Sequence, residues 1–299
     1  MPMASTGCDL IGVPFDGGAT LGWPGARYAP DRIRSSLAWM LMREQDGKIF
    51  SVDEDRILEF GEGTIDDTGD VGVVRHDLLE TMQRTSDAVA ASVTAGRTPI
   101  VVGGEDSLLF PSVRGLHDAV DGTVGLIHFD AHLDLLDQNE TQGEFSHSSG
   151  MRRCTDQLGR FRADKSVQVG VRNFNYPSSR EVIKQAGLTE ISARRFLEIG
   201  ADAAVERIRA AVDGVDHVFF SFDIDAIDPA HAPGAGAHEP GGLTSRHAID
   251  CVRLLAPLVD GFAVTEVNPM MDQKEMTATL AAYLIFNFAL SKRNNTEGS

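Results

Sequence analysis

The feature that most constrains the fold is the alternation of short, almost continuously apolar segments with longer segments of helical periodicity. The apolar segments are rich in Val, Ile and Phe and contain few polar residues. Such segments are typical of strands in a parallel sheet that helices cover on both faces. Six segments have this character: 8–13, 99–102, 124–129, 166–171, 217–222 and 261–267.

Segments of helical periodicity separate these strands, at 76–95, 192–212, 245–258 and 276–293. In the first, the apolar residues fall on one broad face and Gly96 ends the run. Ser192 and Ser245 are candidate N-caps. The alternation predicts one α/β domain over 1–299, a three-layer α/β/α sandwich with a mostly parallel sheet. We expect the ends, 1–7 and 294–299, to be frayed.

The net charge and the composition limit the kinds of partner that the chain is expected to bind. The chain has 27 Lys and Arg against 44 Asp and Glu, a formal net charge of −17. This charge argues against nucleic acid and anionic membranes and is compatible with a small cationic substrate. The longest apolar run, 280–290, is far shorter than the ~20 residues of a membrane span. No basic-then-apolar leader opens the chain, so we expect a cytoplasmic location.

Four polar segments carry the chemistry, and three of them follow predicted strands. They are GGEDS at 103–107, HFDAHLD at 128–134, SFDIDAIDP at 221–229 and EVNP at 266–269. In an open α/β sheet, ligands bind beyond the carboxyl ends of the strands. We therefore expect these segments to meet in one site.

The spacing of the acidic residues indicates a metal centre. Residues two apart in extended chain point to the same side, so Asp130 and His132 converge, together with Asp134 if the strand conformation persists. Asp223 and Asp225 converge in the same way. Buried without a cation, these carboxylates would repel one another strongly. Oxygen ligands with one imidazole suit Mn²⁺ best, then Mg²⁺ and Fe²⁺. Five groups exceed the needs of one ion, which favours two ions that together activate water. An isolated Asp-x-Asp is more often a turn or a cap, but the combination of both motifs is much rarer.

These motifs resemble the ureohydrolase (arginase/agmatinase) family, binuclear manganese enzymes that hydrolyse guanidino or amidino groups. The resemblance begins at GVPFD (12–16) and PGARYAP (24–30), continues through TGDV (68–71) and reaches EVNP (266–269). It implies a parallel sheet of about eight strands flanked by helices, two Mn²⁺ per chain, and assembly as a homotrimer or homohexamer.

The resemblance also implies roles for the metal ligands. Asp130 and Asp223 would bridge the two ions. Asp134 would complete the first site, and His132 with Asp225 the second.

Two further residues match positions that act on the substrate in the family. Glu266 stands where the family binds the guanidinium, a charge-assisted contact that orients the scissile carbon. His147, within FSHSS, aligns with the proton-shuttling histidine, which would protonate the leaving amine. Asp130, as a bridging ligand, belongs to the same catalytic group. The alternative for His147 is an ordinary loop histidine.

The chain departs from the family pattern at the first cluster. The family usually has GGDHS there, and its histidine binds the first metal, whereas this chain has Glu105 and Asp106. Asp106 can ligate Mn²⁺, but it is shorter and adds a negative charge. A non-catalytic, metal-binding relative is therefore the alternative to an enzyme. Ala237 and His238 also replace a threonine-proline pair, and His238 either faces the pocket or fills space.

The substrate can be narrowed only by elimination. Arginases hold the amino-acid end of arginine with an Asn and acidic residues at positions that carry Leu136, Asn173 and Asn175 here. Arginine is therefore disfavoured, and the loop around His147 is more similar to agmatinases and guanidino-acid hydrolases. We expect an agmatinase-like hydrolase that converts agmatine to putrescine and urea. Arg152 or Arg153 would instead favour a carboxylate tail, as in guanidinobutyrate or formimidoylglutamate.

Overall fold

A computed structural model describes residues 7–19 and 21–294. Eight strands pair in parallel in the order β4-β1-β5-β10-β9-β6-β7-β8, which confirms the predicted sheet. They are β1 (Cys8–Gly12), β4 (Ile65–Asp70), β5 (Thr98–Val102), β6 (Val124–Phe129), β7 (Val167–Val169), β8 (Thr189–Ile191), β9 (His217–Asp223) and β10 (Gly261–Thr265). A separate antiparallel hairpin joins β2 (Lys48–Ser51) and β3 (Arg56–Glu59).

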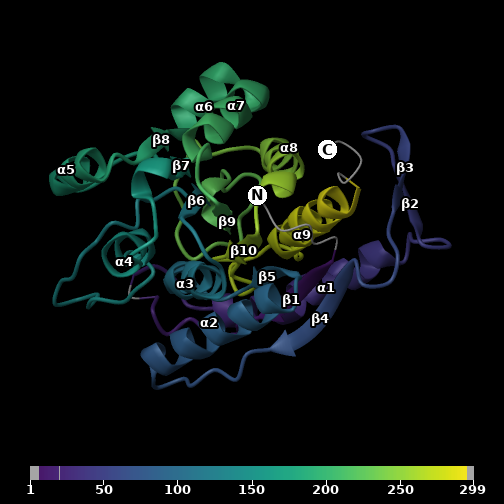
Figure 1. Cartoon of the computed structure of the whole chain (residues 1–299), viewed down its shortest axis with the longest axis horizontal. Helices are drawn as coiled ribbons and strands as arrows, with labels where there is room; N and C mark the ends of the chain where they lie inside the picture. The colour runs from purple at the N-terminus through teal and green to yellow at the C-terminus, as the bar shows by residue number, and fades with distance from the viewer. Residues whose placement is uncertain (1–6, 20, 295–299) are drawn as a thin grey trace.

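Helices cover both faces of the sheet, as the apolar strands require (Figure 1). One face packs against α1 (Ala29–Leu41), α6 (Ala193–Ile199), α7 (Ala201–Val212), α8 (Ser245–Leu255) and α9 (Met276–Asn294). The other packs against α2 (Leu78–Thr94), α3 (Leu109–Ala119), α4 (Gly150–Gln157) and α5 (Pro177–Ala186). The predicted three-layer α/β/α sandwich is thereby confirmed.

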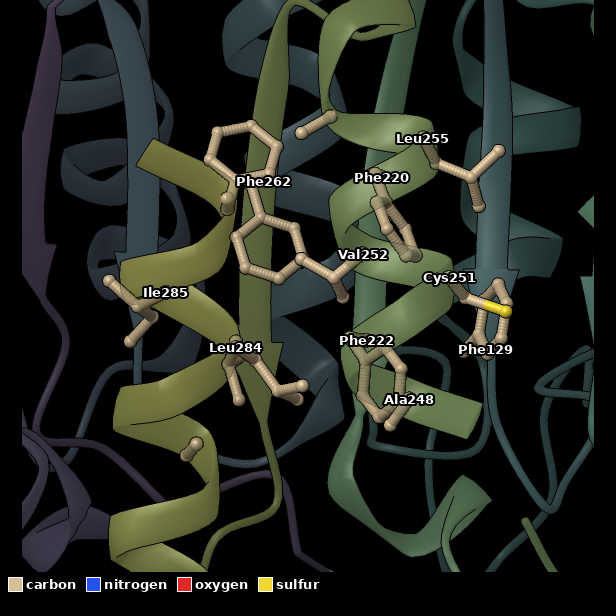
Figure 2. Packing of buried hydrophobic residues seen from close by; sticks show 14 of the residues in the cluster. Phe129, Phe220, Phe222, Ala248, Cys251, Val252, Leu255, Phe262, Leu284 and Ile285 are labelled. Atoms are coloured by element: carbon tan, nitrogen blue, oxygen red, sulfur yellow. The ribbon is translucent and has the colours of Figure 1, made fainter. Parts of the chain in front are cut away.

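Alternation along each strand fills both layers of the core. On β9, Phe220 and Phe222 face α8 and α9, whereas Phe219 joins the opposite cluster. Figure 2 shows Phe220, Phe222 and Phe262 packed against these two helices. Phe262 stacks on Phe288 of α9 with ring centroids 4.5 Å apart. Each fully buried side chain of this size contributes roughly 1.5–3 kcal/mol, so the strands form a rigid base for the residues at their ends.

Two helix boundaries differ from the prediction. The segment predicted as one helix over 192–212 is two, because Gly200, with φ of 81° and ψ of 166°, breaks the helix. Ser192 caps the first of them, as predicted. The cap of α8 is Thr244 and not Ser245, because the side chain of Thr244 forms a capping box with His247.

The ends of the chain fall mostly outside the described residues. Of the expected frayed ends, 1–6 and 295–299 are not described. Gly7 accepts a hydrogen bond from Thr98, and Asn294 bonds to Glu59 of the hairpin. Within 7–19 and 21–294, no helix is long and apolar enough to cross a membrane.

Candidate metal centre

Four neighbouring strands, β5, β10, β9 and β6, end at one edge of the sheet and carry the polar segments identified in the sequence. A cavity of about 130 Å³ lies at this edge. Its lining is Leu21, Gly22, Asp106, His132, Asp134, His147, Ser148, Asp223, Asp225, Ala237 and Glu266. The parallel topology thus brings together residues as far apart in the sequence as Asp106 and Glu266, which are separated by 160 positions.

The first group of candidate ligands is Asp106, His128, Asp130 and Asp134. Each is buried, and one ligand atom from each lies within 4.8 Å of the others. Among the described residues, Asp106 Oδ2, Asp130 Oδ2, Asp134 Oδ2 and His128 Nε2 have no hydrogen-bond partner. Buried polar atoms are normally paired, so four that converge without a partner fit a cation.

The second group is Asp130, His132 and Asp225. His132 Nδ1 lies 3.3 Å from Asp130 Oδ1 and 3.1 Å from Asp225 Oδ2. Asp130 therefore faces both groups, the position that a bridging ligand needs. Asp223, the other residue expected to bridge, lines the same cavity but belongs to neither group. Its Oδ1 accepts a hydrogen bond from the backbone N–H of Asp225 at 2.8 Å.

The electrostatics of the cavity favour a bound cation. Burial, together with Asp130 and Asp106, raises the pKa of Asp134 well above its usual range. Burial and the carboxylates of Asp225 and Asp130 do the same for Asp223. Divalent ions would remove this repulsion, because they offset the charges that the carboxylates impose on one another.

The neighbourhood of Asp106 fits a carboxylate in place of the family's histidine. Thr265, the last residue of β10, donates its hydroxyl hydrogen bond to Asp106 Oδ1 at 2.7 Å. Both side chains are buried, and the bond leaves Oδ2 facing the first group. The turn before Asp106 depends on Gly104, whose φ is 70° and where a Cβ would overlap Leu108. Oxygen and imidazole donors at these positions fit Mn²⁺.

His128 is the site residue that the sequence analysis missed. Its Nε2 lies 3.2 Å from Asp130 Oδ2 and 3.5 Å from Asp106 Oδ2. On its other side, the Gln168 amide nitrogen lies 3.3 Å from Nδ1. The sequence contained the signal, because His128 stands two residues before Asp130 at the end of one strand and so points to the same side.

Glu266 and His147 form a third group, together with Glu105. His147 Nδ1 lies 3.7 Å from Glu266 Oε1, and the Leu21 N–H donates to His147 Nε2 at 3.3 Å. Burial lowers the pKa of His147, but the nearby carboxylates, first Glu266 and then Glu105 and Asp106, together outweigh it, so that the pKa is raised. Glu266 in turn accepts a hydrogen bond from the Asp106 N–H at 2.9 Å. The predicted substrate-binding pair therefore faces the same cavity as the predicted ligands.

Two residues of the cavity have unusual backbone conformations. Asp134 and Glu266 have φ of 50° and 60°, in the left-handed region that residues other than glycine rarely adopt. Such conformations cost on the order of 1–3 kcal/mol and gather at functional sites. The rest of the fold must offset this conformational free energy to hold both carboxylates at the cavity.

The other residues that the sequence analysis singled out fall into two sets: those that line a cavity beside the candidate ligands and those that do not. Leu136 and Asn175 line a second cavity of about 360 Å³ that adjoins the first. Arg152 and Arg153 line neither cavity and are paired with acidic residues. His238 is exposed and bonds to the Pro233 carbonyl at 2.7 Å, outside the lining of both cavities.

Comparisons with known proteins agree with this geometry. The sequence profile of the arginase family matches residues 6–291. Guanidinopropionase of Pseudomonas aeruginosa is 34% identical over 279 residues, covering 93% of this chain and 84% of that protein. Mitochondrial agmatinase of Gallus gallus is 32% identical over 280 residues, covering 93% and 78%. The solved structure of proclavaminate amidino hydrolase from Streptomyces clavuligerus superposes with a TM-score of 0.82 at 29% identity, covering 97% and 92%.

Proposed function

The chain belongs to the arginase family, and from this premise we propose that it hydrolyses a guanidino or amidino C–N bond at a centre of two Mn²⁺ ions. The observation that carries the proposal is the pair of candidate ligand groups that share Asp130. A binding protein would not need two adjoining cation sites beside a separate carboxylate–imidazole pair.

The ligands divide between the two ions as follows. Asp106 and Asp134, with His128 from the same group, would hold the first ion, and His132 with Asp225 the second. Asp130 and Asp223 would contact both. When bound, the two ions supply Lewis acidity and lower the pKa of water for attack on the guanidino carbon.

The chain's own residues orient the substrate and move the proton. Glu266 would pair with the guanidinium and place its carbon toward the ion pair. His147, 3.7 Å from Glu266, would give its proton to the departing amine nitrogen as the C–N bond breaks. Water contributes the new C–O bond, so that a guanidine yields urea and a primary amine. Glu266 is buried and the His147 side chain is only 15% exposed, which limits the access of bulk water to this transfer.

Among the substrates with charged tails, we propose agmatine over guanidino acids and formimidoylglutamate. Arg152 and Arg153, the residues that would have favoured a carboxylate, bind Asp156, Asp137 and Glu144 instead. The product of agmatine hydrolysis would be putrescine with urea. We further propose that the chain forms one domain over 1–299, assembles as a homotrimer or homohexamer, and works in the cytoplasm.

A second candidate function is a non-catalytic metal-binding relative. The observation that favours it is Asp106, which stands where the family has a histidine ligand for the first ion. One ion or none per chain, with tight agmatine binding and no turnover, would support this alternative.

The test is a substrate screen on purified protein loaded with Mn²⁺. Urea release from agmatine, arginine, guanidinobutyrate and guanidinopropionate is measured, together with cleavage of formimidoylglutamate. The control is Asp130→Ala protein treated with the same metal. We expect turnover that the control lacks, and two Mn²⁺ per chain by elemental analysis. Absence of turnover on every substrate would refute the proposal.

A further inference from the structure

We infer that the site prefers an uncharged, mainly hydrocarbon tail even to the ammonium tail of agmatine, the charged-tail substrate proposed above; the inference rests on the proposed function, because the tail extends from a guanidino group bound at the metal centre. It is carried by the second cavity, which we call the tail cavity. Of its described lining residues, four also line the metal cavity: Leu21, His132, Asp134 and Ser148. A molecule with its guanidino group beside Glu266 therefore has this cavity available for the rest of its length.

The walls of the tail cavity are apolar or neutral. Leu133, Leu135 and Leu136 supply apolar lining, together with the aromatic residues Phe174 and Tyr176. Its remaining polar side chains are amides and hydroxyls: Gln142, Ser148, Asn175 and Ser179.

Apart from the phenol of Tyr176, the only charged or titratable groups among the described lining residues are His132 and Asp134. Both belong to the candidate metal groups, so neither is available to pair with a charged tail.

The charged residues near the tail cavity are engaged elsewhere. Arg152 donates to Asp156 at 2.6 Å, and the guanidinium of Arg153 is buried against Asp137 and Glu144. These two cations are therefore not available to a carboxylate tail.

Glu239 is an acidic side chain close to the tail cavity but outside its lining. Its carboxylate lies beyond His132, 3.9 Å from His132 Nε2, and accepts a hydrogen bond from the Asn173 amide. It lines neither the tail cavity nor the metal cavity. An ammonium group in the tail cavity would therefore lack a carboxylate partner.

The rim of the tail cavity exposes aromatic surface. Phe174 is 98% exposed and Tyr176 61% exposed, on the segment between β7 and α5. Apolar surface that a ligand covers favours binding, whereas a charge placed there without a partner loses its hydration. A hydrocarbon tail therefore binds more favourably than a charged one, because it covers this apolar surface and has no charge to desolvate. The cavity volume of about 360 Å³ is at the small end of the range for ligand sites.

Two matched pairs of compounds test the inference on Mn²⁺-loaded protein. Pentylguanidine and agmatine have the same length and differ in a terminal methyl or ammonium group. 4-Guanidinobutanamide and 4-guanidinobutyrate differ in a neutral amide or a carboxylate. We expect kcat/KM for the uncharged member to exceed that of the charged member at least tenfold in each pair, and equilibrium binding by calorimetry to follow the same order.

Variants of the tail cavity sharpen the test. Leu136→Asp places a carboxylate in the wall and should shift the ratio of agmatine to pentylguanidine at least tenfold toward agmatine. Phe174→Asp, at a side chain that is almost wholly exposed, should shift the ratio in the same direction without a packing loss. The control is Leu79→Asp, an exposed leucine on α2, which should leave the ratio unchanged.

The outcomes separate this inference from the proposed function. Faster turnover of agmatine or guanidinobutyrate than of its neutral partner would overturn the inference and leave the hydrolase standing. If no compound is hydrolysed, the proposed function fails, and the order of the binding constants still decides whether the tail cavity prefers an uncharged group. An unchanged ratio in both the Leu136 and Phe174 variants would also overturn the inference.

Discussion

Replacing Thr265 with valine should weaken the hold on one metal ion while leaving the fold intact. The Thr265 hydroxyl donates to Asp106 Oδ1 at 2.7 Å, and both side chains are buried. Valine has the same branched shape, so the strand β10 keeps its packing and loses only the hydrogen bond. Asp106 is then free to turn away from the first ligand group.

The magnitude follows from the kind of bond that is lost. A hydrogen bond to a charged group contributes about 1.5–3 kcal/mol, and a buried carboxylate has no water to replace it. Since about 1.4 kcal/mol changes an equilibrium constant tenfold, this free energy corresponds to a loss of roughly 10- to 150-fold in affinity for the first ion. Substitutions behind metal ligands typically cost 10- to 100-fold, which agrees.

The assay is a competition titration of Mn²⁺ against a chelating dye, which resolves two binding steps. In Thr265→Val one step should weaken by at least tenfold and the other should not change. Thr265→Ser is the matched control, because it keeps the hydroxyl, loses a methyl group, and should keep both affinities despite a lower Tm. Two unchanged affinities in the valine variant would show that Thr265 does not hold Asp106 for the metal.

Three further substitutions test the other roles. Glu266→Gln should raise KM and lower kcat. Because it also removes a carboxylate that raises the pKa of His147, the alkaline limb of the kcat/KM profile should move to lower pH. An alkaline limb that does not move would show that Glu266 does not act on the titration of His147. Asp130→Ala should remove both ions, as elemental analysis would show, whereas retention of both would contradict a shared ligand. Asp106→His removes one negative charge beside the ions, so the pH–rate profile should move toward neutral pH and Mn²⁺ should be retained more tightly; no change in either would exclude Asp106 as a ligand.

The sequence predicted the centre of the sheet better than its edges. The strands β6 and β9 are buried on both faces, so their segments are continuously apolar and stand out. The edge strand β4 has the sequence IDDTGD and is largely exposed, so its residues carry no apolar pattern. At the other edge β8 is only three residues long. These two segments form strands because they pair with β1 and β7, and not because of an apolar pattern in their own sequence.

The sequence predicted those residues of the site that stand at the ends of the parallel strands. Asp130 and Asp223 could be placed because they stand at the ends of β6 and β9, which the parallel topology brings side by side. His132 and Asp225 lie beyond these strands, Asp225 in a 3-10 turn, so the local turns and not strand alternation direct their side chains. Contacts across the sheet could not be found in this way. Thr265 is the last residue of an ordinary apolar strand, and only the pairing of β10 beside β5 brings its hydroxyl to Asp106. The partners of Arg152 and Arg153 likewise depend on how the loop before α4 folds back.

The position of β10 has a consequence for how the protein reaches its native state. This strand is the last of the sheet to be synthesised, yet it lies between β5 and β9 near the middle of the strand order. Until it inserts, β5 and β9 each present an unpaired edge, and such edges invite pairing with other chains. Glu266 and the hydroxyl that holds Asp106 arrive with the same strand, so the metal centre is incomplete until β10 has inserted. Ions that bind after this insertion would stabilise the assembled sheet by mass action, and their removal would raise the fraction of chains with unpaired edges.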